Sequence, residues 1–222
     1  MGKKVLITGS TGMVGQGVLL ECIDSNDIDT IILLNRNSAG VEHPKVYEIL
    51  LPDIREVEKV ESSLSGIDAC FYCMGVSAVG LSEEKYNDLT FNIASNIFKT
   101  LYRLNPEMVG IYVSGQGTDS SAKGSIMWAR VKGKTENMVF ELGGDRAYAY
   151  RPGMIIPERG VKSRTNWYSF IYLIMRPFFP LFKMSKNVTT TVHLGQAMIN
   201  TLLDIPDKKI LLNSDINKLA NK

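Results

Sequence analysis

The stretch KVLITGSTGMVGQG, residues 4–17, decides the fold of this chain. A short apolar run typical of a strand leads into a turn with glycines at three-residue spacing, and a helix-type pattern follows directly. Positions without a side chain let the backbone approach a ligand, and the free N–H groups at a helix start stabilise negative charge. This order predicts a site for the diphosphate of a dinucleotide, formed by Gly9, Ser10, Thr11, Gly12, Met13, Val14 and Gly15.

The alternative is a strand-to-helix turn that binds nothing. The pattern that follows favours the ligand site, because short apolar runs alternate with longer segments of helical period, as in a parallel sheet covered by helices on both faces. Two helices stand out, one over 82–104 with Ser82 as N-cap and one over 125–142 that ends at Gly143-Gly144. The predicted strands are 4–8, 30–34, 46–51, 69–73, 109–114 and 147–151.

Composition limits the class of protein. The chain has 222 residues, 45% of them hydrophobic, which suits one domain over 1–222 with a single core. Lys and Arg number 25 against 23 Asp and Glu, so the net charge of +2 predicts a small-molecule partner and no nucleic acid. Cys70 and Cys73 fall on opposite faces of one predicted strand, which favours buried thiols over a metal or redox pair. With no targeting signal and no apolar span of about eighteen residues, we expect a cytoplasmic protein without a metal site.

The second and later strands indicate which dinucleotide would bind. The second strand ends in Asn35 and Arg36, where an NAD site usually has a carboxylate, and an arginine can pair with the 2′-phosphate of NADP. NADP(H) is therefore favoured over NAD(H), with a solvated loop charge as the alternative for Arg36. Asp53, followed by Ile54, could accept a hydrogen bond from the adenine amino group or form a turn. Met74 and Gly75 end the fourth strand, where the chain passes close to the nucleotide.

The alternation stops after Arg151, and we expect residues 153–205 to form a partly helical lobe that covers the substrate. Basic and aromatic residues interleave over 159–186, with no acidic residue between Glu158 and Asp204. A core or lid helix is favoured for this segment. Peripheral contact of 165–186 with an anionic membrane surface is the competing interpretation.

Five motifs in one order carry a family resemblance: TGSTGMVG, CMG, VSGQG, WARVKGKTE and RPGMIIP. The chain resembles the short-chain dehydrogenase/reductase superfamily in its atypical and extended branches, which include the NAD-dependent epimerase/dehydratase group and the Tat-interacting-protein and NmrA-like proteins. The resemblance implies a Rossmann-type doubly wound sheet in order 3-2-1-4-5-6, with or without a seventh strand, and chemistry at the carboxyl ends of the strands. It also implies that Arg151, Pro152 and Gly153 shape the wall beside the nicotinamide.

The resemblance carries a catalytic lysine to Lys132, which would bond the nicotinamide ribose, and places Trp128 where such enzymes have the proton-transferring tyrosine. An indole N–H donates a hydrogen bond but has no protonation change near neutral pH. Ser114 is our choice for the hydroxyl that polarises the substrate, with Thr118 and Ser125 as alternatives, although each also fits as a cap or loop hydroxyl. The resemblance often places this hydroxyl one or two residues after Ser114, where the chain has Gly115 and Gln116.

Two hypotheses for function follow. The first is an NAD(P)-dependent oxidoreductase of the epimerase/dehydratase type that acts on a small carbonyl or alcohol substrate with an unidentified proton source. The second is a non-catalytic regulator that senses NADP(H) and reports to a protein partner, as NmrA-like proteins do.

Overall fold

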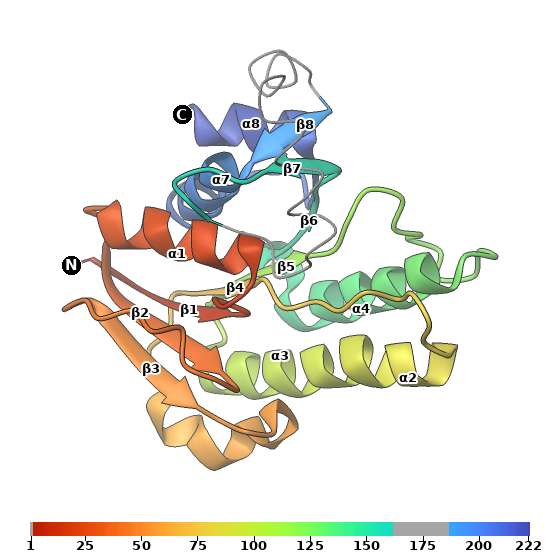
Figure 1. The fold of residues 1–222 in the computed structure, drawn as a ribbon, viewed down its shortest axis with the longest axis horizontal. Helices are drawn as coiled ribbons and strands as arrows, with labels where there is room; N and C mark the ends of the chain where they lie inside the picture. The colour runs from red at the N-terminus through yellow and green to blue at the C-terminus, as the bar shows by residue number, and fades with distance from the viewer. Residues whose placement is uncertain (1, 162–186) are drawn as a thin grey trace.

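The computed structural model describes residues 2–161 and 187–222. Within these ranges, seven parallel strands form one sheet in the order β3-β2-β1-β4-β5-β6-β9 (Figure 1). The predicted order 3-2-1-4-5-6 is confirmed, and β9 adds the seventh strand. The strands of the sheet are β1 (Lys3–Thr8), β2 (Ile28–Asn35), β3 (Val46–Leu50), β4 (Ala69–Tyr72), β5 (Val109–Val113), β6 (Ala147–Arg151) and β9 (Ile210–Leu212).

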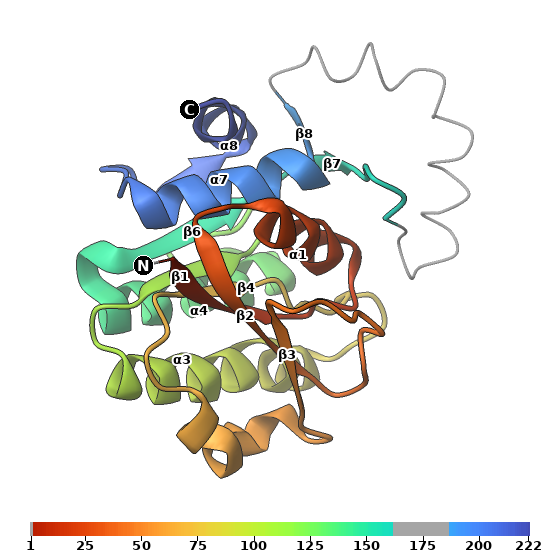
Figure 2. The ribbon, with the colours of Figure 1, turned by 90° about the vertical axis from the view of Figure 1, so that its left-hand side faces the viewer.

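Helices cover both faces of the sheet. One face carries α1, α7 and α8, and the other carries α3 and α4, as Figures 1 and 2 show. A long 3-10 helix, η1, packs beside α3, and the short helices α2 and η2 lead into α3. The helices are α1 (Met13–Asp24), η1 (Ile54–Ser63), α2 (Glu83–Asn87), η2 (Asp88–Asn92), α3 (Ile93–Leu104), α4 (Met127–Gly143), η3 (Gly144–Arg146), α7 (Thr191–Leu203) and α8 (Asn213–Ala220).

The apolar runs in the sequence reflect this burial on two sides. In β1, Val5 and Ile7 belong to the core under α1 and α7, whereas Leu6 belongs to the core under α3 and η1. Cys70 and Cys73 divide in the same way between the two cores, as their spacing predicted. A strand buried on both faces needs apolar side chains at every position, so it reads as a continuous apolar run.

Two helices differ in detail from their predictions. Ser82 caps α2 as expected, accepting a hydrogen bond from the Lys85 N–H, but the helix then passes through the π-helical turn η2 before α3 begins. An apolar stripe fixes the buried face of a helix and not its hydrogen-bond register, so this turn could not be seen in the sequence. α4 begins at Met127, two positions after the predicted start, and ends at the predicted glycines.

Part of the predicted substrate lobe belongs instead to the helical layer. α7 packs along α1, where Gly17 permits the close approach: a Cβ at this position would lie 2.5 Å from the Cβ of Thr191. Leu194 and Met198 of α7 are fully buried in the core beneath α1. Before α7, β7 (Met154–Ile156) and β8 (Val188–Thr190) form a small parallel pair. Residues 162–186, which include most of the aromatic and basic segment, lie outside the described residues.

Candidate functional site

The glycine turn connects β1 to α1 at the carboxyl end of the sheet. Gly9 adopts a φ of 71°, and a Cβ there would lie 2.8 Å from the backbone of Met74. The N–H of Gly12 donates to the Gly9 carbonyl at 2.9 Å, and a side chain at Gly15 would collide with that same carbonyl. The three glycines therefore let β1, β4 and the start of α1 pack closer than side chains would allow.

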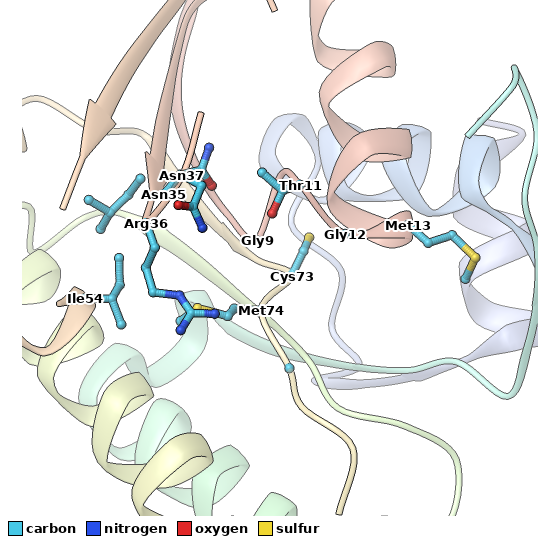
Figure 3. Close-up of a pocket in the computed structure, with 12 residues that line it drawn as sticks. Gly9, Thr11, Gly12, Met13, Asn35, Arg36, Asn37, Ile54, Cys73 and Met74 are labelled. Atoms are coloured by element: carbon cyan, nitrogen blue, oxygen red, sulfur yellow. The ribbon is translucent and has the colours of Figure 1, made fainter. Parts of the chain in front are cut away.

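A cavity of about 280 Å³ opens beside this turn (Figure 3). The ends of β1, β2 and β4 and the start of η1 all contribute to its wall, so it lies where ligands bind in sheets of this topology. In Figure 3, the Arg36 side chain extends from the end of β2 toward Met74, and the Cys73 side chain points toward the glycine turn. The lining residues are Gly9, Thr11, Gly12, Met13, Leu34, Asn35, Arg36, Asn37, Ile54, Cys73, Met74 and Gly75.

Nine of the residues predicted to bind a cofactor line this cavity, and Ser10, Val14, Gly15 and Asp53 adjoin them in the chain. Lys132 and residues 151–153 do not line it. Ser10 is buried, and its Oγ accepts a hydrogen bond from Asn35 Nδ2 at 2.7 Å. Val14 packs against the core, and Gly15 lies under the turn. Asp53 caps η1 by accepting from the Arg55 N–H at 3.1 Å, which is the turn role that the sequence left open.

Sequence reasoning did not identify three lining residues, Leu34, Asn37 and Cys73. Each directly adjoins a predicted site residue at the end of a strand, so a wider window at each strand end would have included them.

Asn35 has a structural role in addition to its place in the wall. Its Nδ2 donates to Ser10 Oγ and also to Glu48 Oε1 at 2.8 Å, so it connects the glycine turn to β3. Burial alone would raise the pKa of Glu48, but hydrogen bonds from Ser38, the Ala39 N–H and Asn35 outweigh it and lower this pKa. Glu48 is thus held ionised, and the amide of Asn35 is fixed in orientation.

Lys132 and Ser114 meet at the carboxyl end of β5. Lys132 Nζ donates to the backbone carbonyl of Ser114 at 2.5 Å, whereas Ser114 Oγ lies 2.5 Å from Glu136 Oε1. Burial lowers the pKa of Lys132, and the nearby Glu136 carboxylate acts in the opposite direction. Of the two alternatives, the Thr118 hydroxyl donates to the Gly115 carbonyl at 2.8 Å, and Ser125 is exposed in the loop before α4. The hydroxyls of Ser114 and Thr118 are therefore engaged by the protein itself.

Trp128 lies on the first turn of α4, one turn before Lys132, and is half-buried. Its ring lies over the loop after β5, where a Cβ on Gly117 would be 3.3 Å from the indole. Gly115 leaves space beside the lysine, since a Cβ there would be 3.8 Å from Lys132 Nζ. Trp128 and Gly115 thus bring an indole and no hydroxyl to the surroundings of Lys132.

The motif Arg151-Pro152-Gly153 follows β6 and connects neighbouring elements. Arg151 pairs with the buried carboxylate of Glu136, with Nε at 2.9 Å from Oε1. The carbonyl of Pro152 accepts from the Gln116 N–H at 2.9 Å, and the Gly153 N–H donates to Asn213 Oδ1 at 3.1 Å. These residues do not line the cavity beside the glycine turn, and their contact with a cofactor stays a prediction.

Residues 2–161 and 187–222 bring together no group of three His, Cys, Asp or Glu side chains suited to a metal ion. Nor does any helix in these ranges have the length and apolar character needed to cross a membrane.

Structures of known proteins share this fold. A short chain dehydrogenase/reductase from Saccharomyces cerevisiae superposes with a TM-score of 0.66 at 16% identity, with 99% of each chain covered. The Bordetella bronchiseptica enzyme WbmH, solved in complex with NAD+, gives a TM-score of 0.67 at 14% identity over 95% of this chain and 74% of that one.

Sequence comparisons agree with the resemblance in the motifs. Protein HTATIP2 of Rattus norvegicus is 24% identical over 207 residues, which cover 90% of this chain and 81% of that protein. Protein fmp52, mitochondrial, of Emericella nidulans is 27% identical over 169 residues, covering 70% of this chain and 68% of that protein. The model of the NAD dependent epimerase/dehydratase family matches residues 5–118, from β1 through the loop after β5. The chain therefore belongs to the NAD dependent epimerase/dehydratase family.

Proposed function

We propose that the chain binds a nicotinamide dinucleotide beside the glycine turn, NADP(H) in preference to NAD(H), and uses it to oxidise or reduce a small carbonyl or alcohol compound. The observation that carries the proposal is the turn itself, in which Gly9 has a positive φ and lies against the backbone of Met74. The family match over residues 5–118 supports it, as does the NAD+ bound by WbmH, which has the same fold.

The cavity has the chemistry that a dinucleotide needs. α1 starts at Met13 with no acidic residue in its first turn, so its N-terminal N–H groups and the helix dipole favour the negative diphosphate. Leu34, Ile54 and Met74 supply apolar wall for a flat base. A Cβ at Gly9 or Gly15 would collide with neighbouring backbone atoms, so the shape of the glycine turn depends on glycine at both positions.

Arg36 supports the preference for NADP(H). Its side chain is exposed, lines the cavity, and makes no hydrogen bond or ion pair with the residues that the structure describes. A free guanidinium at the end of β2 can bind the 2′-phosphate with two parallel hydrogen bonds. The neighbouring Asn35 amide is already held by Ser10 and Glu48 and brings no carboxylate that would repel this phosphate.

The cofactor, when bound, supplies or accepts the hydride. The chain's own contribution is the ammonium of Lys132, which we assign to the nicotinamide ribose. Trp128 cannot exchange a proton near neutral pH, so a water or another hydroxyl must carry the proton to or from the substrate oxygen.

The first test is a pair of calorimetric titrations of the full chain with NADPH and with NADH. We expect tighter binding of NADPH, and a loss of about 10- to 100-fold in its affinity in Arg36→Gln, because a charge-assisted hydrogen bond contributes about 1.5–3 kcal/mol. NADH affinity should hardly change in this variant. Lys59→Gln, an exposed cation that pairs only with Glu56 among the described residues, is the matched control. If neither nucleotide binds the native chain, the proposal is refuted.

A second function is favoured by Trp128 and Gly115 together, namely a regulator that binds NADP(H) and reports the nucleotide state to a protein partner. This alternative accounts for a chain that keeps the glycine turn and its cavity but has neither a tyrosine at position 128 nor a hydroxyl at position 115. It predicts tight NADPH binding with no turnover by the native chain on a panel of aldehydes and ketones. Turnover by the native chain on any of these compounds would favour the oxidoreductase.

A further inference from the structure

Glu136 is a fully buried carboxylate behind the Lys132 site. It lies on α4, has no exposed surface, and its Oε1 lies 2.5 Å from Ser114 Oγ. Its two oxygens also accept from Arg151, with Nε at 2.9 Å from Oε1 and Nη2 at 2.5 Å from Oε2. A carboxylate without contact to water is tolerated only when charged and polar donors surround it. Arg151 and Ser114 supply such donors to Glu136.

Lys132 and Glu136 hold two different groups of the same residue. They are one helical turn apart on α4, and Lys132 Nζ donates to the backbone carbonyl of Ser114 while Glu136 meets its hydroxyl. The position of the Ser114 carbonyl, and therefore of the ammonium, depends on how Ser114 is anchored. Ser114 is anchored by Glu136 and, through its N–H at 2.8 Å, by the Tyr150 carbonyl.

The groups that face this pair come from three elements. Arg151 approaches from β6, with its side chain 13% exposed, and it also donates to Ser120 Oγ in the loop after β5 at 2.6 Å. Tyr112 approaches from β5, and burial, together with the Glu136 carboxylate, raises its pKa, so it stays neutral. Lys132 lies one helical turn before Glu136 on α4, and the Glu136 carboxylate acts to raise its pKa against the effect of burial. The carboxylate of Glu136 thus acts on two cations, Lys132 and Arg151.

We propose that Glu136 is a positioning residue, which anchors Ser114 as the acceptor for Lys132 and supplies the negative charge that keeps the Lys132 ammonium in place, while Arg151 sets how much of that charge Lys132 receives. This inference rests on the proposed function, because the ammonium is the group assigned to the nicotinamide ribose. It matters more here than in a chain with the tyrosine, since holding the ribose is the remaining task of Lys132.

A merely structural pair would behave differently. If Glu136 and Arg151 only join α4 to β6, removing either residue loosens the same contact, and Lys132 responds in the same direction in both variants. If Glu136 acts as the counter-charge, removing Glu136 and removing Arg151 have opposite effects. Loss of the Glu136 carboxylate destabilises the charged form of Lys132 and lowers its pKa. Loss of the Arg151 guanidinium removes a competing positive charge, so the carboxylate stabilises the Lys132 ammonium more strongly and raises its pKa.

The test is an NMR titration of the nucleotide-free full chain with carbon-13 dimethyl labels on its lysines, in which Lys132→Arg identifies the signal. In Glu136→Gln, we expect Lys132 to titrate at lower pH than in the native chain, and in Arg151→Gln at higher pH. Glu141→Gln, an exposed carboxylate on the same helix, should leave the titration unchanged. Shifts in the same direction in both variants, or no shift in either, would overturn the proposal.

Removing one charge of a buried pair can also unfold a chain, so circular dichroism accompanies each variant. If Glu136→Gln does not fold, the upward shift expected in Arg151→Gln decides the question alone. NADPH titrations then separate this inference from the proposed function. Above the lowered midpoint of Lys132 in Glu136→Gln, NADPH affinity should fall by about tenfold relative to the native chain. If the native chain binds no nucleotide and the opposite shifts are seen, the proposed function fails while the role of Glu136 in setting the charge of Lys132 stands.

Discussion

Trp128 and Gly115 are two residues near Lys132: Trp128 lies one helical turn before it, and a Cβ on Gly115 would be 3.8 Å from its Nζ. The indole packs over Gly117, and the space next to Gly115 opens toward Lys132 Nζ. General acid–base catalysis typically contributes about a hundred- to ten-thousand-fold in rate. Under the proposed function, the chain therefore keeps Lys132 to bind the cofactor but has Trp128 and Gly115 where the resemblance implies the groups that transfer the proton and polarise the substrate.

Restoring both groups should restore chemistry. Lys132 is in place, and the space beside Gly115 accepts a hydroxyl, so we expect the double variant Trp128→Tyr, Gly115→Ser to oxidise NADPH with an aldehyde or ketone panel about a hundredfold faster than native. The measurement is the loss of NADPH absorbance at saturating nucleotide. Trp128→Phe with Gly115→Ser is the control, because it opens the same space without the phenol. Equal rates in the two double variants would contradict the prediction.

The residue types of Ser114 and Arg151 do not decide whether these side chains bind a ligand or another residue of the protein. Both are polar residues at the ends of strands that face the site, which is why the sequence marked them as ligands of substrate and cofactor. In the folded chain their polar groups meet Glu136, a residue 22 positions after Ser114 and 15 positions before Arg151. Glu136 lay within the WARVKGKTE motif, but its burial was not visible in the sequence.

Among the elements, the connection from β1 to α1 is the most constrained. Gly9 combines a positive φ with a close approach to Met74, so it is glycine for two independent reasons. Gly66 has nearly the same φ, 70° against 71°, but a Cβ there would meet nothing within 4 Å. A substitution at Gly66 therefore measures the cost of the positive φ without the cost of a collision, and serves as the control for Gly9.

Gly9→Ala should therefore destabilise the fold more than Gly66→Ala. Backbone strain alone costs about 1 kcal/mol, and the added collision with β4 costs roughly 1–3 kcal/mol more. Urea unfolding of both variants measures the difference in the free energy of unfolding. NADPH binding should be lost in Gly9→Ala and kept in Gly66→Ala. Equal destabilisation by the two substitutions would show that the approach to Met74 is not what requires glycine.

At the scale of the whole molecule, the cavity joins segments that are distant in sequence. The turn at 9–13, the end of β2 at 34–37, the start of η1 at Ile54 and the end of β4 at 73–75 meet only when the sheet is formed. A nucleotide that contacts all four segments binds the folded chain and not the unfolded one. Its binding free energy therefore adds to the stability of the whole domain.

NADPH should raise the melting temperature of the native chain accordingly. At a free concentration of about one hundred times Kd, the stabilisation is about 2.7 kcal/mol, which corresponds to roughly 5–10 °C for a domain of this size. Thermal unfolding followed by circular dichroism, with and without NADPH, measures the shift. Arg36→Gln at the same NADPH concentration should show a smaller shift. A native melting temperature that NADPH does not change would contradict nucleotide binding.

The sequence by itself determined the six predicted strands, the order of the sheet through a family resemblance, the cap at Ser82 and the glycine turn. These features follow from local rules: a strand buried on both faces is apolar throughout, and a backbone that must adopt a positive φ requires glycine. Such rules act over a few neighbouring residues, so they can be read along the chain.

Only the tertiary structure decided the rest. It placed α7 in the layer beside α1, added β9 to the sheet, and joined Ser114, Lys132 and Arg151 through Glu136. Each of these outcomes depends on how segments distant in sequence pack together. The last also depends on the donors that surround a buried charge. No periodicity along the chain encodes that choice, because it is made by the shape and polarity of the folded interior.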